Sequence, residues 1–252
     1  MRNLILVGAS ALALAVGMGS AQAMVISQGS SAFTVDWSCN TNLCNSPGNT
    51  IPPTGVTLAG TATFSNFNFT TEMSGAVDVS FNVSLSNTTT QGSLSLANWQ
   101  SVRLTSFAWD TLPDATGISN TSTVYPTAVL ESNFPSFMTV DVCNSSGPTC
   151  PGGANGGTFP VGSGGTPTSD SFSMSLTGFH AGTTSVDFGT NVTGGTELFD
   201  VKFQTAFGSF EFQDQPTPPS PPPSVPEPAS LVLLGTALVG LGSVFRRRQH
   251  AA

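Results

Sequence analysis

The sequence predicts an all-β fold, an antiparallel β-sandwich of jelly-roll or immunoglobulin-like type, with an N-terminal signal helix and a C-terminal hydrophobic helix outside the domain. Apolar and polar residues alternate along several short stretches, as they do in strands with one buried and one wet face. Breaks rich in glycine, proline and asparagine separate these stretches, and no long stretch between the two ends repeats with a helical period. Short strands with turn signals between them favour a sandwich.

The clearest alternation runs from Val77 to Leu85, where apolar residues alternate with Asp, Ser and Asn. The same pattern recurs in three later segments. We expect their polar members, including Asp200, Lys202 and Glu211, to face water. The three segments span residues 172–176, 199–204 and 210–212.

Residues 24–214 have the length of one all-β domain. Charged residues make up only 8% of the chain, against about 25% in average soluble domains. Between Asp36 and Asp214 thirteen acidic residues stand against Arg103 and Lys202, a net charge of about −11. This charge excludes nucleic acid and anionic bilayer surfaces as expected partners.

The N-terminal segment, residues 1–23, has the three parts of a secretion signal. Arg2 supplies the positive charge, Leu4 to Val16 the apolar stretch, and Ala21 and Ala23 the small-x-small cleavage step. We expect cleavage after Ala23. An uncleaved anchor is the alternative, although the apolar stretch is shorter than the roughly 20 residues of a spanning helix.

The C-terminal region begins with a proline-rich stretch, residues 215–224, that we expect to stay out of any helix or sheet and to act as an extended spacer. An apolar run at 231–245 follows, closed by Arg246, Arg247 and Arg248. The positive-inside rule keeps these arginines in the cytoplasm and places the domain outside the inner membrane. Alone, the run would be an ordinary membrane anchor of marginal length.

The motif before the apolar run makes the interpretation more specific. Val225, Pro226, Glu227 and Pro228, followed by a glycine-containing apolar helix and an arginine cluster, resemble the PEP-CTERM sorting signal, which would span residues 225–252. In proteins with this signal an exosortase, a membrane-embedded cysteine protease, recognises the Pro-Glu-Pro step. The resemblance implies that the tail is removed or exchanged after transient insertion in the inner membrane, in a Gram-negative bacterium that makes exopolysaccharide.

A second resemblance rests on the order of six segments in the mature region. They are ATFSNFNF, VDVSFNVSLSNTT, RLTSFAWDTLPDATG, VDVCNSSGPTCPGGANGG, FSMSLTGF and LFDVKFQTAFGS. Their order is similar to that in the cistern family of PEP-CTERM proteins, which has a Phe-x-x-Asp-type segment and a closing Arg/Lys-Phe-Gln-Ser strand. This chain differs where Trp109 precedes Asp110 and where Thr205 ends the segment Lys-Phe-Gln-Thr. No biochemical activity is assigned to the family, so the resemblance implies an exported surface protein without implying a mechanism.

Four cysteines in an exported chain are most simply paired in disulfides. Three connectivities are possible, and we favour the local one, Cys39 with Cys44 and Cys143 with Cys150, because each pair brackets a turn-rich segment. A redox or zinc site is the rival interpretation, but the sequence lacks a C-x-x-C step and histidines near the cysteines. We expect no metal and no cofactor.

The aromatic residues, eighteen Phe, three Trp and one Tyr, predict a phenylalanine-rich core. We expect Trp37, Trp99 and Trp109 to pack in that core. A sugar-stacking platform is the alternative, for which Trp109 beside Asp110 is best placed. Residues 152–167 are nearly all Gly, Pro, Ser and Thr, which predicts a mobile loop.

Catalytic residues are not evident. Nucleophilic catalysis needs a base, and His180, the one histidine of the mature region, is expected in a surface turn. Two carboxylates suffice for a glycosidase, and Asp110 with Asp114, or Asp187 with Glu197, could be nominated; polar strand faces already explain them.

Three functions follow in order of preference. The first is a non-catalytic cell-surface or exopolysaccharide-matrix protein that the secretion translocon and an exosortase handle during export, with exopolysaccharide as an expected partner. The second is an extracellular carbohydrate-binding module, and the third is a secreted glycoside-active enzyme.

Overall fold

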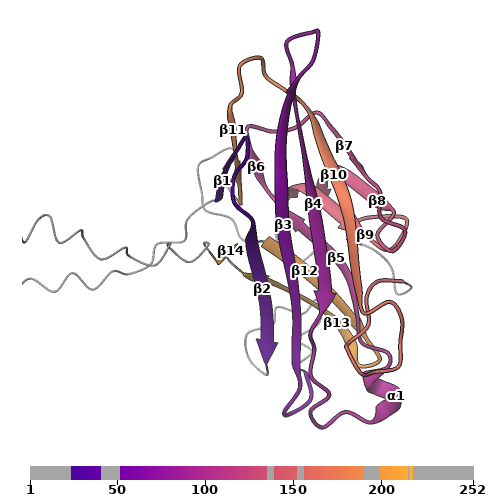
Figure 1. Cartoon of the computed structure of the whole chain (residues 1–252). Helices are drawn as coiled ribbons and strands as arrows, with labels where there is room; N and C mark the ends of the chain where they lie inside the picture. The colour runs from indigo at the N-terminus through magenta and orange to yellow at the C-terminus, as the bar shows by residue number, and fades with distance from the viewer. Residues whose placement is uncertain are drawn as a thin grey trace, which may run out of the picture. The chain divides into compact units, whose positions relative to one another are not determined.

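The structure, a computed structural model, describes residues 24–40, 52–134, 139–151, 156–189, 199–214 and 216–217. These residues form three antiparallel sheets and one short helix with sandwich-like packing, which confirms the predicted all-β class (Figure 1). The expected signal helix and C-terminal hydrophobic helix lie outside the described residues. No helix within the described ranges is long and apolar enough to span a bilayer.

The largest sheet has six strands, and its central strands β3, β4 and β10 are long. Its spatial order is β14 (Pro216–Thr217), β2 (Phe33–Asn40), β3 (Thr57–Thr71), β4 (Val77–Asn87), β10 (Ser169–Phe179) and β7 (Gly117–Asn120).

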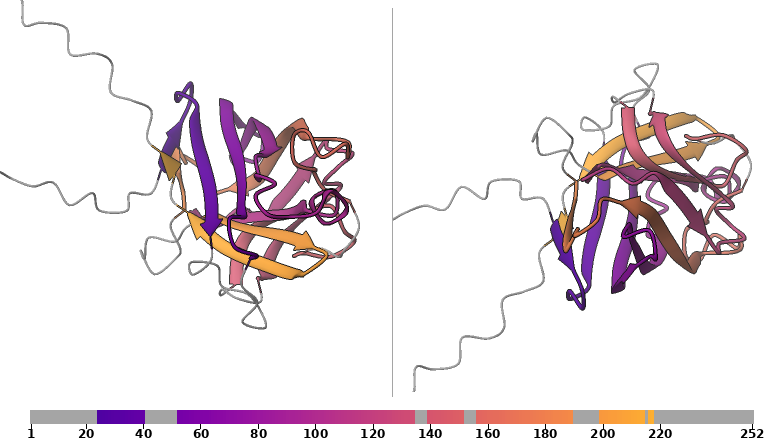
Figure 2. Two further views of the ribbon diagram at one scale, coloured as in Figure 1. Left: turned by 90° about the horizontal axis from the view of Figure 1, so that it is seen from below. Right: turned by 90° about the horizontal axis from the view of Figure 1, so that it is seen from above.

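A five-stranded sheet forms the second layer, and a small three-stranded sheet lies beside it (Figure 2). The five strands are, in spatial order, β13 (Gly208–Asp214), β12 (Phe199–Thr205), β5 (Arg103–Trp109), β9 (Thr139–Ser145) and β8 (Thr127–Asn133). The three are β1 (Met24–Ser27), β11 (Ser185–Phe188) and β6 (Thr111–Leu112).

Aromatic rings from both large sheets meet in the core. Phe64 of β3 lies edge-on to Trp109 of β5, with ring centroids 5.3 Å apart. Phe33 of β2 lies 5.9 Å from Phe199 of β12. The indole N–H of Trp37 donates a hydrogen bond to the Phe199 carbonyl oxygen at 2.7 Å. These contacts hold the two inner faces together, as in a β-sandwich.

The predicted alternation is confirmed between Val77 and Leu85 of β4, which pairs with β3 on one side and β10 on the other. The apolar residues of this stretch point into the core, and its Ser and Asn side chains point outward. The buried residues are Val77, Val79, Phe81, Val83 and Leu85.

The expectation that Asp200 and Glu211 face water is wrong. Asp200 is 2% exposed and Glu211 is fully buried. The two strands β12 and β13 pair so that Lys202 lies opposite Glu211, and Lys202 Nζ is 3.3 Å from Glu211 Oε1. A neighbouring strand therefore supplies the counter-ion that allows the carboxylate to leave water.

The loop expected to be mobile at 152–167 is instead tied to the core over its central part; its residues 152–155 lie outside the described ranges. The backbone of Thr158 exchanges two hydrogen bonds with Leu104, at 3.0 and 3.1 Å. The side-chain amide of Asn87 donates to the Thr158 carbonyl oxygen at 2.8 Å. Composition predicted a loop correctly, but these tertiary hydrogen bonds fix its path.

Tyr125 completes this buried junction. Its hydroxyl donates to the Leu104 carbonyl oxygen at 2.8 Å and accepts from the Thr158 N–H at 3.1 Å. Burial raises the pKa of Tyr125 far above its ordinary value, and nearby Asp170 adds to the rise, whereas the Thr158 hydrogen bonds oppose it. The hydroxyl therefore stays protonated and serves as a structural link.

Both ends of the described domain enter sheets. Met24, the residue after the predicted cleavage step, already pairs with Phe188 of β11. Pro216 and Thr217 pair with β2, although the proline-rich stretch was expected to stay out of any sheet. The edge of a sheet tolerates proline, because a ladder N–H is not required there.

Candidate functional site

The residues expected to direct export and sorting lie outside the part of the chain that the structure describes. They are the cleavage residues Ala21 and Ala23, the motif residues Val225, Pro226, Glu227 and Pro228, and the arginines Arg246, Arg247 and Arg248.

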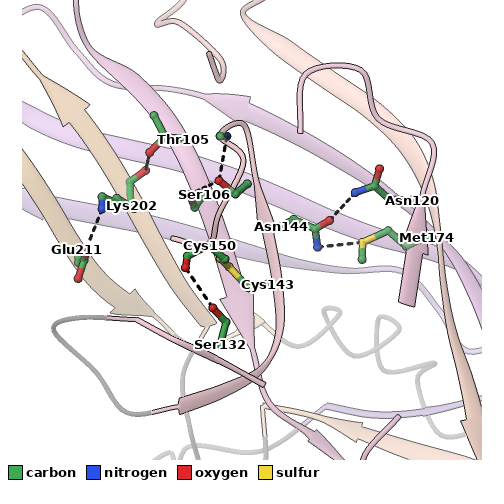
Figure 3. The surroundings of a disulfide bond; sticks show 12 residues. Thr105, Ser106, Asn120, Ser132, Cys143, Asn144, Cys150, Met174, Lys202 and Glu211 are labelled. Carbon is green, nitrogen blue, oxygen red and sulfur yellow. Dashed lines mark hydrogen bonds and ion pairs between the residues drawn. A yellow bond between two sulfur atoms is a disulfide. The ribbon is translucent and has the colours of Figure 1, made fainter. Parts of the chain in front are cut away.

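The cysteines follow the predicted local pairing where the structure describes them. Cys143 of β9 and Cys150 form a disulfide, with Cα atoms 6.2 Å apart (Figure 3). The hydroxyl of Ser132 donates to the Cys150 carbonyl oxygen at 3.2 Å. Cys39 is buried and disulfide-bonded, and its expected partner Cys44 lies outside the described residues.

The disulfide loop covers a small second core on the outer side of the five-stranded sheet. Cys143, Ala108 and Phe134 are fully buried there, and Cys150 packs against them. Cysteine at this place is therefore a packing element. Within the described ranges no group of three or more His, Cys, Asp or Glu side chains is placed to hold a metal ion.

The tryptophans do not form a sugar-stacking platform. Trp37 is 1% exposed and Trp109 is fully buried, and Trp109 is surrounded by phenylalanine rings of both large sheets. Trp99, in the four-residue helix α1 (Leu96–Trp99), is half-buried. The core interpretation is confirmed for Trp37 and Trp109, and the platform interpretation that favoured Trp109 is wrong.

Asp110 and Asp141 hold the chain where it passes from β5 into β6. Asp110 accepts a hydrogen bond from the Asp141 N–H at 2.9 Å, and Asp141 accepts one from the Thr111 N–H at 2.8 Å. Asp110 is 2% exposed, whereas Asp114 is exposed. Of the first nominated pair, Asp110 thus accepts a hydrogen bond from the backbone, and Asp114 lies on the surface.

The second nominated pair is only half described, because Glu197 lies outside the described residues; Asp187 is half-exposed on β11. His180 is exposed at the end of β10, where its carbonyl oxygen accepts a hydrogen bond from the Thr183 N–H at 3.1 Å. This confirms the expected surface turn. His180, Asp114 and Glu131 line an open hollow of about 640 Å³.

A different surface was missed from the sequence. Outward side chains along the middle of β3, β4 and β10 form an uncharged array that we call the hydroxyl face, and Figure 1 shows these three strands on the side of the molecule nearest the viewer. A hollow of about 330 Å³ opens at its centre. The hydroxyl face consists of Thr63, Ser65, Asn82, Ser84, Ser171 and Ser173.

Hydrogen bonds between neighbouring strands fix the side chains of the hydroxyl face. The Ser173 hydroxyl donates to Asn82 Oδ1 at 2.9 Å, and the Ser171 and Ser84 hydroxyls are 3.1 Å apart. The alternation of Ser and Asn with apolar residues was visible in the sequence. The register that places β10 beside β4 was not, and only the register makes the two patterns one surface.

Comparison with protein families matches residues 224–248 to the PEP-CTERM protein-sorting motif. No curated protein and no solved structure matches the chain. The match leaves the cistern resemblance of the β-sandwich a prediction. The motif implies a protein that is exported in a Gram-negative bacterium and sorted by an exosortase. The chain therefore carries a PEP-CTERM protein-sorting motif at its C-terminus.

Proposed function

We propose that the mature chain is a non-catalytic protein of the cell surface or of the exopolysaccharide matrix, to which an exosortase delivers it. The observation that carries the proposal is the PEP-CTERM motif at residues 224–248. The motif follows a β-sandwich whose largest sheet presents uncharged hydroxyl and amide groups along the middle of its outward face. Such a surface suits contact with a hydrated, hydroxyl-rich matrix.

The surroundings of Asp110, one of the nominated carboxylates, support a structural role. Asp110 and Asp141 accept hydrogen bonds from backbone N–H groups at the junction of β5 and β6. Carboxylates in such contacts stabilise a chain path, which accounts for Asp110 and the neighbouring Asp141 without catalysis.

A carbohydrate-binding module remains the second candidate, and the hydroxyl face is the observation that favours it. It would differ from the platform expected from the sequence, because Trp37 and Trp109 are in the core. Recognition would rest on hydrogen bonds rather than on stacking.

Intact mass of the protein recovered from producing cells tests the sorting step. In cells with the exosortase we expect a chain that starts at Met24 and lacks residues 231–252. In cells without it we expect the tail to be retained and the protein to remain in the membrane fraction. A Glu227→Gln variant should behave as in cells lacking the exosortase, whereas Pro222→Ala in the spacer should be processed normally.

Fractionation of the same cultures tests the destination. The processed protein should be recovered with the cell surface or the extracted polysaccharide, and the unprocessed protein should not. Permanent retention of the tail where the exosortase is active would overturn the proposal.

A further inference from the structure

We infer that the hydroxyl face is a docking surface for an uncharged, hydroxyl-rich polysaccharide. The inference deepens the proposed matrix function and rests on it, because it names the surface and the chemistry of the partner. It follows from the accessibility, order and charge of this face.

The hydroxyl face is accessible. Asn82, Ser84, Ser171 and Ser173 are all exposed, and no element of the described ranges lies in front of β3, β4 and β10 (Figure 1). The outer side of the five-stranded sheet differs, because Phe134 and the disulfide-bonded Cys150 pack there against Ala108 and Cys143 and cover part of it. The larger sheet thus leaves its polar side open.

The face is ordered before any ligand arrives. Adjacent strands in a sheet lie about 4.8 Å apart, and outward residues of one strand repeat every 6–7 Å or so, so the side chains form a grid. Bonds such as Ser173 to Asn82, and the 3.1 Å contact of Thr34 with Thr63, hold members of the grid in place. Ordered groups lose little conformational entropy on binding.

The hollow gives the grid a place where a ligand group can enter. It is lined by Ser65, Asn82, Ser84, Ser171 and Ser173, among other residues. A β-bulge lies at its border, because the register of β3 against β4 shifts between Ser65 and Asn68. Bulges of this kind change the direction of side chains and the local twist of a sheet.

Hydroxyl and amide groups both donate and accept hydrogen bonds, and each hydroxyl has one donor and two acceptor positions. One contact with a neighbouring side chain leaves capacity for a second partner. A sugar hydroxyl has the same dual capacity. The hollow and the grid around it therefore match a ligand that offers many hydroxyl groups at short repeats.

Charge selects an uncharged partner. The six residues of the hydroxyl face carry no charge, while the region between Asp36 and Asp214 carries about −11. This field repels a polyanionic polysaccharide and also a second copy of the chain. A protein interface would further need the aromatic and apolar centre that stable interfaces have, and the outward groups of this face are hydroxyls and amides.

A polymer engages many weak contacts at once. Single hydrogen bonds to an exposed face contribute little, but neighbouring rows of the grid can bind successive sugars of one chain, which raises the overall affinity. Weak binding to single sugars and measurable binding to the polymer are the expected combination.

Affinity electrophoresis of the processed protein tests the inference, with gels that contain hydroxyethyl cellulose, dextran or alginate. We expect retardation by at least one of the two uncharged polymers and none by alginate. The double variant Asn82→Asp with Ser171→Asp places two negative charges on the face, while the carboxylate introduced at position 82 keeps an acceptor for the Ser173 hydroxyl. It should bind about tenfold more weakly or worse, as expected from the loss of several hydrogen bonds.

The matched control carries the same added charge elsewhere, through Thr149→Asp and Thr184→Asp at two exposed positions outside the face. It should bind like the unaltered protein, and thermal melting of all three proteins should show that each is folded. Should the face variant fail to fold, the single variant Asn82→Asp, which keeps the side-chain shape, replaces it and is expected to weaken binding in the same direction.

Three results of the electrophoresis overturn the inference: no retardation by either uncharged polymer, equal weakening in the face variant and its control, or stronger retardation by alginate. Sedimentation that shows a dimer dissociated by the face variant would assign the face to self-association and also overturn it. The proposed matrix function fails separately, through the mass and fractionation results. An unretarded protein that is still processed and recovered with the matrix would refute only the polysaccharide contact of this face.

Discussion

Single residues decide how much of this sequence's polar and aromatic chemistry is available for function. Trp109 and Tyr125 are both fully buried, so their rings and polar atoms pack inside the domain and do not reach a ligand at the surface. The two differ in their polar atoms, since the Tyr125 hydroxyl is hydrogen-bonded and the Trp109 indole nitrogen has no partner among the described residues. This difference can be measured by substitution.

Trp109→Ala is expected to lower the free energy of unfolding by about 3–5 kcal/mol, because it leaves a cavity between the two sheets. Trp109→Phe should cost clearly less, since no hydrogen bond to the indole N–H is lost. Urea unfolding of both variants measures the two costs. A stable Trp109→Ala protein that had lost polysaccharide binding would restore the platform interpretation and contradict the structure.

Tyr125 predicts how stability depends on alkaline pH. Its pKa is raised by burial in the folded state, whereas in the unfolded chain it is about 10. Above that pH the unfolded state releases the proton and the folded state keeps it, so stability falls by about 1.4 kcal/mol per pH unit. Urea unfolding at pH 9 and pH 11 should show this fall, and Tyr125→Phe should lack the part due to this group.

The chain has one tyrosine, so tyrosinate absorbance follows Tyr125 alone. In the folded protein this absorbance should not rise near pH 10, and it should rise there once urea has unfolded the chain. Titration near pH 10 in the folded protein would contradict the burial of the hydroxyl.

At the scale of elements, the loop around Gly157 is positioned by close backbone contact. Gly157 has a φ of 91°, and a Cβ there would collide with the Leu104 carbonyl group. Gly182 has a similar φ of 82° with open space around it. Gly182→Ala should therefore cost about 1–2 kcal/mol from backbone conformation alone, and Gly157→Ala about 1–3 kcal/mol more.

Urea unfolding of the two glycine variants measures the difference, with the Gly182 protein as the matched control. Equal costs would mean that the loop can move away from Leu104 and that its hydrogen bonds to the strand are dispensable. In that case the mobile loop expected from composition would be the better description.

The sequence predicted elements well where one strand's own alternation decides burial, as in β4. The prediction failed where a residue on another strand or in a distant segment decides whether a side chain is buried or where a loop lies. Glu211 is buried because Lys202 lies opposite it on the adjacent strand, and Thr158 is fixed by Leu104 and Tyr125, which are distant in the chain. The hydroxyl face was missed for the same reason, because pairing between β4 and β10 is a property of the fold.

At the scale of the whole molecule, the predicted site of signal cleavage coincides with the start of the first described strand. The predicted cleavage step ends at Ala23, and β1 begins at Met24. Cleavage there leaves β1 complete for pairing with β11, whereas cleavage four residues later would remove it. The site of signal cleavage therefore decides whether the small three-stranded sheet can form.

Two adjacent residues of β1 test this dependence, because Ile26 is fully buried and Val25 is 58% exposed. Ile26→Ala should lower the free energy of unfolding of the processed protein by about 2–5 kcal/mol, and Val25→Ala by about 0.5 kcal/mol or less. A chain that starts at Gln28 should lose at least as much as the Ile26 variant, because it also loses the strand pairing with β11. Unfolding in urea compares the three proteins; an unchanged stability of the shortened chain would show that β1 is dispensable and that the fold places no demand on where the signal is cut.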